Sequence, residues 1–240
     1  MLPILFQNNN FILYSYPLLM GLAWGVGYQY FFRHIDNIDR LRAQIFFWGI
    51  FISAWIGAKT FFIITSSAHL TSEFINSANF WMGGGFVFYG GLIGGALFAL
   101  TYHFIWPLPF TWIKSTLVAL TLGHGIGRIG CFLAGCCYGD ITTAWWGIHL
   151  HGQDRHPTQL IEAFFLLSLA YGLKRINSLH RLFGVYTLSY GVLRFALECL
   201  RADQLRGEWL WGLTPSQWIS IFLVIPGIYL LVEKAFKPSK

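Results

Sequence analysis

Residues 113–134 read IKSTLVALTLGHGIGRIGCFLA, and this stretch decides the class of protein. A bilayer core of roughly 30 Å is crossed by about 20 mainly apolar residues in a helix. Only Lys114 and Arg128 carry a formal charge here, and Lys114 lies at the very start. The stretch therefore predicts a membrane-spanning helix that holds one cation, Arg128, inside its apolar length.

Six further segments of similar length and composition lie along the chain. They are approximately 11–32, 43–65, 86–105, 158–174, 182–200 and 214–234. Only 11% of the residues are charged, about half the usual share of a soluble domain. The N-terminus has no Lys or Arg ahead of the first segment, so we interpret that segment as a retained span and not as a secretory signal. We expect an all-α polytopic membrane protein of about seven transmembrane helices that forms one domain, residues 1–240.

The distribution of Lys and Arg predicts the orientation of the spans, because these residues are retained on the cytoplasmic side. Alternate loops and span ends hold ten of the sixteen cations. These are Arg33, Arg40, Arg42, Lys114, Lys174, Arg175, Arg181, Lys234, Lys237 and Lys240. The N-terminus should lie outside and the C-terminus inside. The other loop set holds only three cations, Arg155, Arg201 and Arg206. The formal charge of +6 forms no basic stripe, so we expect no nucleic-acid partner.

Three cations, Lys59, Arg128 and Arg194, fall within or at the ends of apolar spans. A charge near the bilayer centre costs about 2.5–3.5 kcal/mol on insertion scales, so such residues usually face a bundle interior, a cavity or a ligand. Arg128 and Arg194 are therefore candidates for function. For Lys59 we favour a side chain that extends to the membrane surface along its apolar stem.

Six glycines between Gly123 and Gly139 thin out the end of the fourth span around Arg128. A guanidinium in such a setting offers five donors to a phosphate or carboxylate. The alternative is a helix packed through small residues, with the arginine at the membrane interface. The four cysteines, three of which are Cys131, Cys136 and Cys137, are too few for a disulfide scaffold, and their spacing is not a usual zinc pattern.

The sixth span carries Arg194, Glu198 and Arg201 at spacings of four and three, which place them on one helical face. Glu198 can then stabilise one or both guanidinium groups. A structural ion pair is the alternative interpretation. Together with Arg128 on another helix, the pattern suggests an anionic head group held between the two arginine clusters near the outer face.

Several further side chains are candidates for an acid or a base. His156 precedes Pro157 at the start of the fifth span, and His124 lies one turn before Arg128. Either can titrate near neutral pH, although a hydrogen-bonded structural histidine is the commoner case. Tyr89 precedes the glycines of the third span and fits equally well in an interfacial aromatic belt. We expect His149 and His151 only to face water.

Taken in order, these segments resemble the prolipoprotein diacylglyceryl transferases, seven-span bacterial enzymes. The matching elements are Tyr16 at the first span, Gly90-Gly-Leu-Ile-Gly94, Gly127-Arg-x-Gly130 with Gly139, Arg155-His-Pro-x-Gln159-Leu-x-Glu162, and Tyr190-Gly-x-x-Arg194-x-x-x-Glu198-x-x-Arg201. The combination is specific to this family, whereas none of the elements is specific singly.

The resemblance implies transfer of the diacylglyceryl group from phosphatidylglycerol to the thiol of a lipobox cysteine in a prolipoprotein signal peptide, with release of glycerol phosphate. The reaction would take place in the outer leaflet of the bacterial inner membrane, without a metal or organic cofactor. Arg128 and Arg194 would be the essential arginines, supported by Glu198 and Arg201. The resemblance also implies contacts with substrate or a shaping role for Tyr16, Gly90, Gly91, Cys131, Gly139 and Gln159.

The chain departs from the family pattern at three positions. Tyr89 replaces the histidine that usually precedes Gly-Gly-Leu-Ile-Gly, and Cys131 and Cys136 replace an asparagine and a glutamate. The base that would accept the thiol proton therefore stays open between Tyr89, His124 and His156. Other interpretations are a paralogue with another lipid donor or acceptor, a transporter or lipid-binding protein, and a membrane thiol oxidoreductase that uses the three clustered cysteines.

Overall fold

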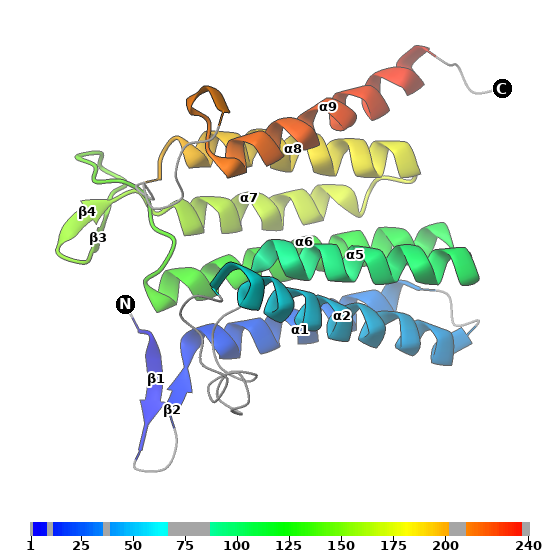
Figure 1. Cartoon of the computed structure of the whole chain (residues 1–240), viewed down its shortest axis with the longest axis horizontal. Helices are drawn as coiled ribbons and strands as arrows, with labels where there is room; N and C mark the ends of the chain where they lie inside the picture. The colour runs from blue at the N-terminus through cyan, green and yellow to red at the C-terminus, as the bar shows by residue number, and fades with distance from the viewer. Residues whose placement is uncertain (1, 9–11, 36–38, 67–86, 202–209, 237–240) are drawn as a thin grey trace. The chain divides into compact units, whose positions relative to one another are not determined.

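The computed structural model describes residues 2–8, 12–35, 39–66, 87–201 and 210–236 (Figure 1). These residues form seven α-helices and two short β-hairpins. The chain divides into two compact units: Met1–His34 with Phe110–Lys240, and Ile35–Pro109. Each unit is described by itself below. Arg206, Lys237 and Lys240, which entered the orientation prediction, lie outside the described residues.

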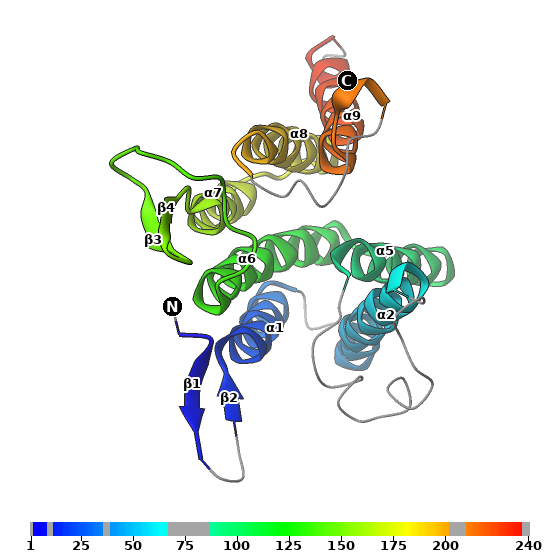
Figure 2. The same cartoon turned by 60° about the vertical axis from the view of Figure 1, so that its left-hand side comes forward.

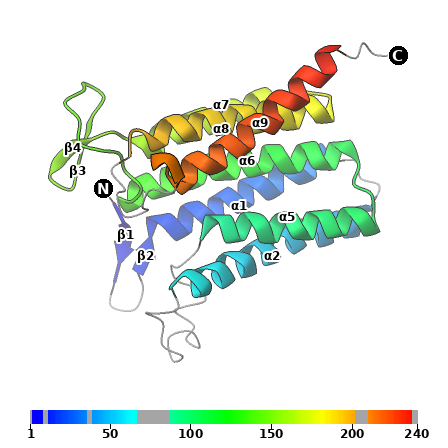
Figure 3. The same cartoon turned by 45° about the horizontal axis from the view of Figure 1, so that its top comes forward.

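The first unit contains five helices, two hairpins and a short 3-10 turn. Its elements are β1 (Ile4–Gln7), β2 (Ile12–Tyr14), α1 (Ser15–His34), α6 (Phe110–Ala134), β3 (Ile148–Leu150), β4 (Gln153–Arg155), α7 (Thr158–Leu173), α8 (Leu179–Glu198), the 3-10 turn (Leu210–Gly212) and α9 (Pro215–Phe236). Helix α1 packs on α6, α6 on α7, α7 on α8, and α8 on α9. Figure 2 and Figure 3 show this succession from two further sides.

Glycine contacts show that neighbouring helices of this unit run in opposite directions. A Cβ on Gly130, near the end of α6, would lie 3.1 Å from Leu19 near the start of α1. A Cβ on Gly191 in the second half of α8 would lie 2.9 Å from Val224 in the first half of α9. The end of α6, the starts of α1, α7 and α9, and the end of α8 therefore share one end of the unit.

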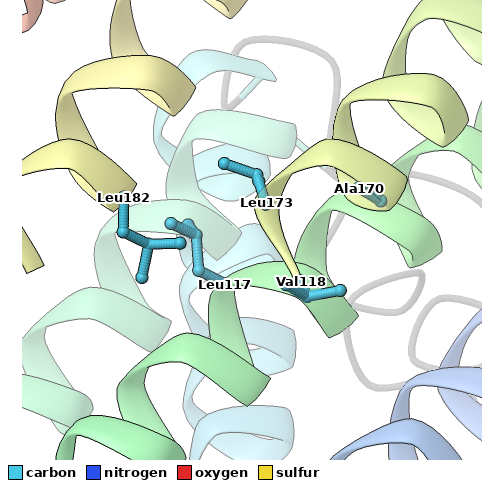
Figure 4. Packing of buried hydrophobic residues seen from close by; sticks show 5 residues of the cluster. All are labelled: Leu117, Val118, Ala170, Leu173 and Leu182. Carbon is cyan, nitrogen blue, oxygen red and sulfur yellow. The ribbon is translucent and has the colours of Figure 1, made fainter. Parts of the chain in front are cut away.

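The opposite end is held by an apolar cluster of Leu117, Val118, Ala170, Leu173 and Leu182 (Figure 4). These residues come from the first half of α6, the last turn of α7 and the first turn of α8. Fully burying a leucine-sized side chain contributes roughly 1.5–3 kcal/mol. The cluster thus fixes α6, α7 and α8 at one end and leaves polar side chains of the same helices at the other.

The second unit pairs α2 (Arg40–Ser66) with α5 (Phe88–Ile105). A Cβ on Gly90 would lie 2.4 Å from the carbonyl oxygen of Gly57, and one on Gly94 would lie 2.3 Å from the carbonyl of Ser53. Backbones this close tolerate only glycine. Lys59 has no exposed surface, which contradicts the prediction that its side chain extends to the membrane surface.

The expectation of an all-α membrane protein is confirmed. Segments Arg40–Thr65, Phe110–Ala134 and Pro215–Val232 are long and apolar enough to cross a bilayer, and Tyr89–Ile105 and Thr158–Leu173 are shorter apolar helices. Phe104 and Phe164 expose 84% and 76% of their surface. Large exposed apolar side chains on helix after helix indicate lipid as the surrounding medium.

The predicted span boundaries agree with the helices to within a few residues, apart from the start of the first. That span was predicted to begin at residue 11, but α1 begins at Ser15 because Ile12–Tyr14 pair with Ile4–Gln7 as an antiparallel hairpin.

Candidate active site

Glu162 is the centre of a buried polar cluster at the end of the first unit that lies opposite the apolar cluster. Its Oε2 lies 2.9 Å from Nε of Arg128, and its Oε1 lies 3.7 Å from Nε2 of His124. The hydroxyl of Tyr190 donates a hydrogen bond of 3.2 Å to the same Oε1. Only 2% of the glutamate side chain is exposed. One carboxylate from α7 thus holds two side chains of α6 and one of α8.

Arg194 forms a second buried ion pair on α8. Its Nη2 donates to Oε2 of Glu198 at 2.7 Å and to the hydroxyl of Ser216, at the start of α9, at 3.1 Å. Thr214 donates to the other oxygen of Glu198 at 3.1 Å. Among the described residues, Nη1 of Arg194 is buried without a hydrogen-bond partner. The arginine is therefore fixed by one nitrogen and keeps a further donor for another acceptor.

The two ion pairs lie close together along α8. Tyr190, which contacts Glu162, and Arg194 are four residues apart, so both lie on the same face of the helix within about one turn. Arg128 reaches that face through Glu162. The predicted gathering of Arg128, Arg194 and Glu198 at one end of the helices is what the structure shows.

Gly139 joins three segments beside this cluster. Its N–H donates to the carbonyl of His156 at 2.9 Å, and it forms an isolated β-bridge with Arg201. A Cβ here would lie 2.6 Å from Cβ of His156 and 2.7 Å from the carbonyl of Leu200. Any larger residue at position 139 would separate the start of α7 from the end of α8, which explains the glycine.

The three cysteines gather where α6 ends. Gly135 has φ 75°, and the N–H of Cys136 donates to the carbonyl of Cys131 at 3.1 Å. A left-handed glycine followed by this bond is a Schellman motif, which folds the chain back over the last turn of the helix. The Sγ atoms of Cys131, Cys136 and Cys137 lie within 4.8 Å of one another, and the thiols are free.

Side chains from other elements fix the cysteine loop through its carbonyl groups. His151 bonds the carbonyl of Gly135 at 2.9 Å, Gln159 donates to that of Cys136, and Thr158 donates to that of Cys137 at 3.0 Å. His149 and His151 were expected only to face water, but Nδ1 of His149 lies 3.0 Å from Oδ1 of Asp154 and His151 bonds the carbonyl of Gly135, so that prediction is wrong. Gln159 was assigned to substrate by the resemblance, and the contact that the structure shows for it is with the loop.

Electrostatics place the loop beside the arginines. Hydrogen bonds from the thiols of Cys131 and Cys136, together with the charges of Arg128 and Arg201, hold the pKa of Cys137 below its ordinary value. Tyr16 on α1 lies beside the last turns of α6, because a Cβ on Gly130 would be 3.4 Å from its ring.

The candidate bases differ in what surrounds them. The indole N–H of Trp146 donates to Nδ1 of His156 at 3.1 Å, so that nitrogen serves as an acceptor in a surface contact. His124 faces Glu162 inside the cluster and packs edge-on to the Tyr190 ring, with the ring centroids 5.4 Å apart. His124 therefore lies in the buried polar cluster around Glu162, whereas the contact of His156 is a hydrogen bond with Trp146 at the surface.

Tyr89, Gly90 and Gly91 belong to the second unit. Gly90 is buried against Gly57, and a Cβ on Gly91 would lie 3.2 Å from the carbonyl of Ala54. Packing of α5 on α2 accounts for the two glycines. Their assignment to lipid binding, and that of Tyr89 to proton transfer, stay predictions.

Glu162 is the residue whose role the sequence reasoning missed. It ends the Arg155-His-Pro-x-Gln159-Leu-x-Glu162 element and is a carboxylate inside a predicted span. The rule that made Arg128 a candidate, that a charge within a span needs a partner, applies to it equally. That rule would have paired the two.

A sequence model of the prolipoprotein diacylglyceryl transferase family matches residues 3–233. The chain belongs to this family. The phosphatidylglycerol–prolipoprotein diacylglyceryl transferase of Clostridium tetani is 30% identical, over 99% of this chain and 99% of its own length. The enzyme numbered 2 of Clostridium perfringens is 34% identical over 95% and 93%, and that of Lactococcus lactis subsp. cremoris is 32% identical over 77% and 75%.

Membership of the transferase family confirms the resemblance that the motifs indicated. The departures at Cys131 and Cys136, where the resemblance implies an asparagine and a glutamate, stay part of the prediction made from the sequence. In this chain the carboxylate beside Arg128 is that of Glu162 on α7.

Proposed function

We propose that this chain transfers the diacylglyceryl group of phosphatidylglycerol to the thiol of a lipobox cysteine in a prolipoprotein, releasing glycerol phosphate. Family membership over residues 3–233 and full-length relatives with that name support the proposal. We further propose a multi-pass protein of the bacterial inner membrane. The polar cluster lies at the helix ends that the distribution of Lys and Arg assigns to the outer side.

The observation that carries the proposal is the joining of two buried Arg–Glu pairs through Tyr190. Arg128 with Glu162, and Arg194 with Glu198, lie within about one helical turn of each other along α8. Each pair is neutral by itself, and Arg201, whose charge acts on Cys137 together with that of Arg128, adds a third guanidinium nearby. The cluster therefore has one net positive charge, which matches the single negative charge of a phosphodiester.

The transfer reaction is accelerated by groups that bind the phosphate more strongly in the transition state than in the bound lipid. The thiolate sulfur attacks the terminal glycerol carbon of the diacylglyceryl group, and the bond from that carbon to the phosphate oxygen breaks. The leaving glycerol phosphate gains a second negative charge. Guanidinium donors fixed beforehand by Glu162 and Glu198 stabilise that charge more than they stabilise the bound lipid, which lowers the barrier.

The test is a transfer assay with the purified full chain in detergent, labelled phosphatidylglycerol and a lipobox peptide. We expect a thioether product with the cysteine peptide and none with a serine peptide. Arg194→Lys should reduce the rate about 100-fold or more, because a lysine cannot reproduce the fixed fork of donors. Arg33→Lys, a change at an exposed arginine in the last turn of α1, is the matched control and should leave the rate unchanged.

Two results would contradict the proposal. Bound phosphatidylglycerol without thioether product, when several lipobox peptides are offered, would favour a paralogue with another acceptor. Disulfide exchange by the three clustered thiols, without any lipid transfer, would favour a membrane thiol oxidoreductase.

A further inference from the structure

Three thiols converge at the end of α6 with the spacing of a metal-binding site. The Sγ atoms of Cys131, Cys136 and Cys137 all lie within 4.8 Å of one another. Zinc binds thiolates at about 2.3 Å in a tetrahedral arrangement, which puts ligand sulfurs about 3.8 Å apart. Closing the cluster around such a cation needs shifts of the order of 1 Å or less by side chains alone.

The backbone is built to bring these thiols together. The Schellman motif places Cys136 over Cys131, and Cys137 takes a left-handed conformation with φ 61°. A non-glycine residue in that region is strained by roughly 1–3 kcal/mol, and such strain persists where the surroundings impose it. The surroundings do so here, because the carbonyls of residues 135–137 each accept a hydrogen bond from a side chain of another element.

Other uses of three thiols explain less of this geometry. A disulfide needs two sulfurs about 2.05 Å apart and leaves the third thiol without a role. A cysteine that carried the diacylglyceryl group between donor and acceptor would form a thioether, which is too poor a leaving group to pass the group on. A site with three protein ligands and one open position uses all three thiols.

We propose that Cys131, Cys136 and Cys137 bind a zinc ion, or a cation of the same soft thiolate-preferring class, and that the acceptor cysteine of the prolipoprotein is its fourth ligand. This inference rests on the proposed function, since it assigns the activation of the acceptor thiol. It departs from the family resemblance, which implies no metal. The metal would generate the acceptor thiolate, a role that the resemblance gives to the histidine replaced here by Tyr89.

The acceptor thiol then needs no dedicated histidine base. When the thiol binds as a ligand, its proton is released to water, because a coordinating thiol is deprotonated outright. The lone pair of the bound sulfur forms the new C–S bond with the glycerol carbon. The C–O bond to phosphate breaks, and its electron pair leaves on glycerol phosphate. No electron is gained or lost overall, so no oxidant or reductant is required.

The position of the cluster suits this role. Cys131 follows Arg128 by three residues on α6, so both lie on one face with Cβ atoms about 5–6 Å apart. A thiol held at the cluster is therefore beside a lipid whose phosphate is held by Arg128. Three thiolates around a divalent cation would have one net negative charge, and the guanidinium groups of Arg128 and Arg201, whose charges act on Cys137, would stabilise it.

The first measurement is the metal content of the full chain, purified in detergent without chelator. We expect about one zinc per chain, as for a single three-thiolate site. Cys131→Ser, Cys136→Ser and Cys137→Ser should each lower that content at least tenfold. Cys199→Ser is the matched control, because this exposed cysteine follows the last residue of α8 and is not one of the clustered thiols; it should keep the full content.

The second measurement replaces zinc by Co²⁺ and follows its absorption spectrum. We expect sulfur-to-cobalt charge-transfer bands that strengthen when a lipobox peptide with cysteine is added, and no change with the matching serine peptide. A spectrum unchanged by the cysteine peptide would overturn the fourth-ligand assignment, because the cation would then be structural. Full transfer activity after complete removal of the metal would overturn the inference as well.

Failure of the inference is distinguishable from failure of the proposed function. If no thioether forms but cobalt responds to the cysteine peptide, the metal site stands and the donor lipid is wrong. If thioether forms at an undiminished rate in all three serine variants, the transferase stands and the role of the metal in activating the acceptor thiol is refuted. Recovery of a Cys131–Cys136 disulfide in metal-free protein of full activity would refute it too.

Discussion

Two glycine-rich segments of this protein are alike in sequence and different in structure. In α5, residues 90–95 meet backbone: an added Cβ on Gly90 would lie 2.4 Å from a carbonyl oxygen of α2. In α6, residues 123–130 meet mostly side chains, such as Sδ of Met20, 3.4 Å from a Cβ on Gly127. The first segment brings two helix backbones into contact, and the second makes room around charged side chains.

The difference shows that glycine content alone does not identify a site in a membrane helix. What separates the two segments is the presence of ionisable partners. Arg128 and His124 project from α6 toward a carboxylate of α7, whereas the glycines of α5 lie against α2. Substitutions in the two segments should therefore have different consequences, catalytic in α6 and structural in α5.

The largest effect is expected for Arg128→Lys. The ammonium keeps the charge but loses the planar set of donors between Glu162 and the phosphate, so transfer should fall about 100- to 1,000-fold. The melting temperature in detergent should stay within a few degrees of that of the wild type. Arg33→Lys again serves as control. An Arg128→Lys protein with normal activity would contradict the claim that the glycine-rich segment of α6 serves catalysis.

A structural effect of about 1–3 kcal/mol is expected for Gly90→Ala, because its Cβ would displace the backbone of α2. Gly91→Ala is the matched control, since its Cβ would lie 3.2 Å from the nearest carbonyl and should cost less. Denaturant unfolding in detergent measures both. Activity per folded molecule should be unchanged; a selective loss of transfer at normal stability would instead support the assignment of Gly90 to lipid binding.

A smaller effect is expected for Tyr190→Phe, which removes the hydrogen bond to Glu162 and leaves the ring in place. The loss of one buried hydrogen bond is worth about 1 kcal/mol, so the transfer rate should fall about threefold to tenfold. Tyr186→Phe, a change to the ring that stacks on Tyr190, is the control. An unchanged rate in Tyr190→Phe would show that the hydrogen bond to Glu162 does not contribute to transfer.

The smallest effect is expected for Gly127→Ala. Its Cβ would lie 3.4 Å from the thioether of Met20, a flexible side chain that can move by a few tenths of an ångström. Stability should change by less than about 1 kcal/mol, and transfer by less than twofold. A large loss at this position would mean that α6 needs glycine for backbone contact, as α5 does.

The helices could be predicted well from the sequence because a membrane span is recognised by one simple criterion, about 20 mainly apolar residues in a row. Apolar length gave all seven helices of the described residues, and it failed at Ser15 because Ile12–Tyr14 is apolar and yet forms a strand. The arginines were found for the same reason: a charge within a span is conspicuous without any knowledge of the fold.

The partners of those arginines depend on tertiary structure. Glu198 was predicted for Arg194 because a spacing of four fixes the contact within one helix. Glu162 and Arg128 lie on different helices, and only the packing of α6 on α7 brings them together. The clustering of the three cysteines was visible in the sequence, but the approach of their Sγ atoms to within 4.8 Å was not, because it depends on a left-handed Gly135 and not on spacing.

The backbone junction at Gly139 has a consequence for biogenesis. Gly139 and Asp140 bond to His156 and Leu200, residues that are synthesised after α6 has left the ribosome. Contacts between distant parts of a chain form late. A nascent chain that ends before α7 should therefore insert α6 while Arg128 still lacks its partner Glu162, and quality-control proteases that recognise incomplete membrane proteins would meet it in that state.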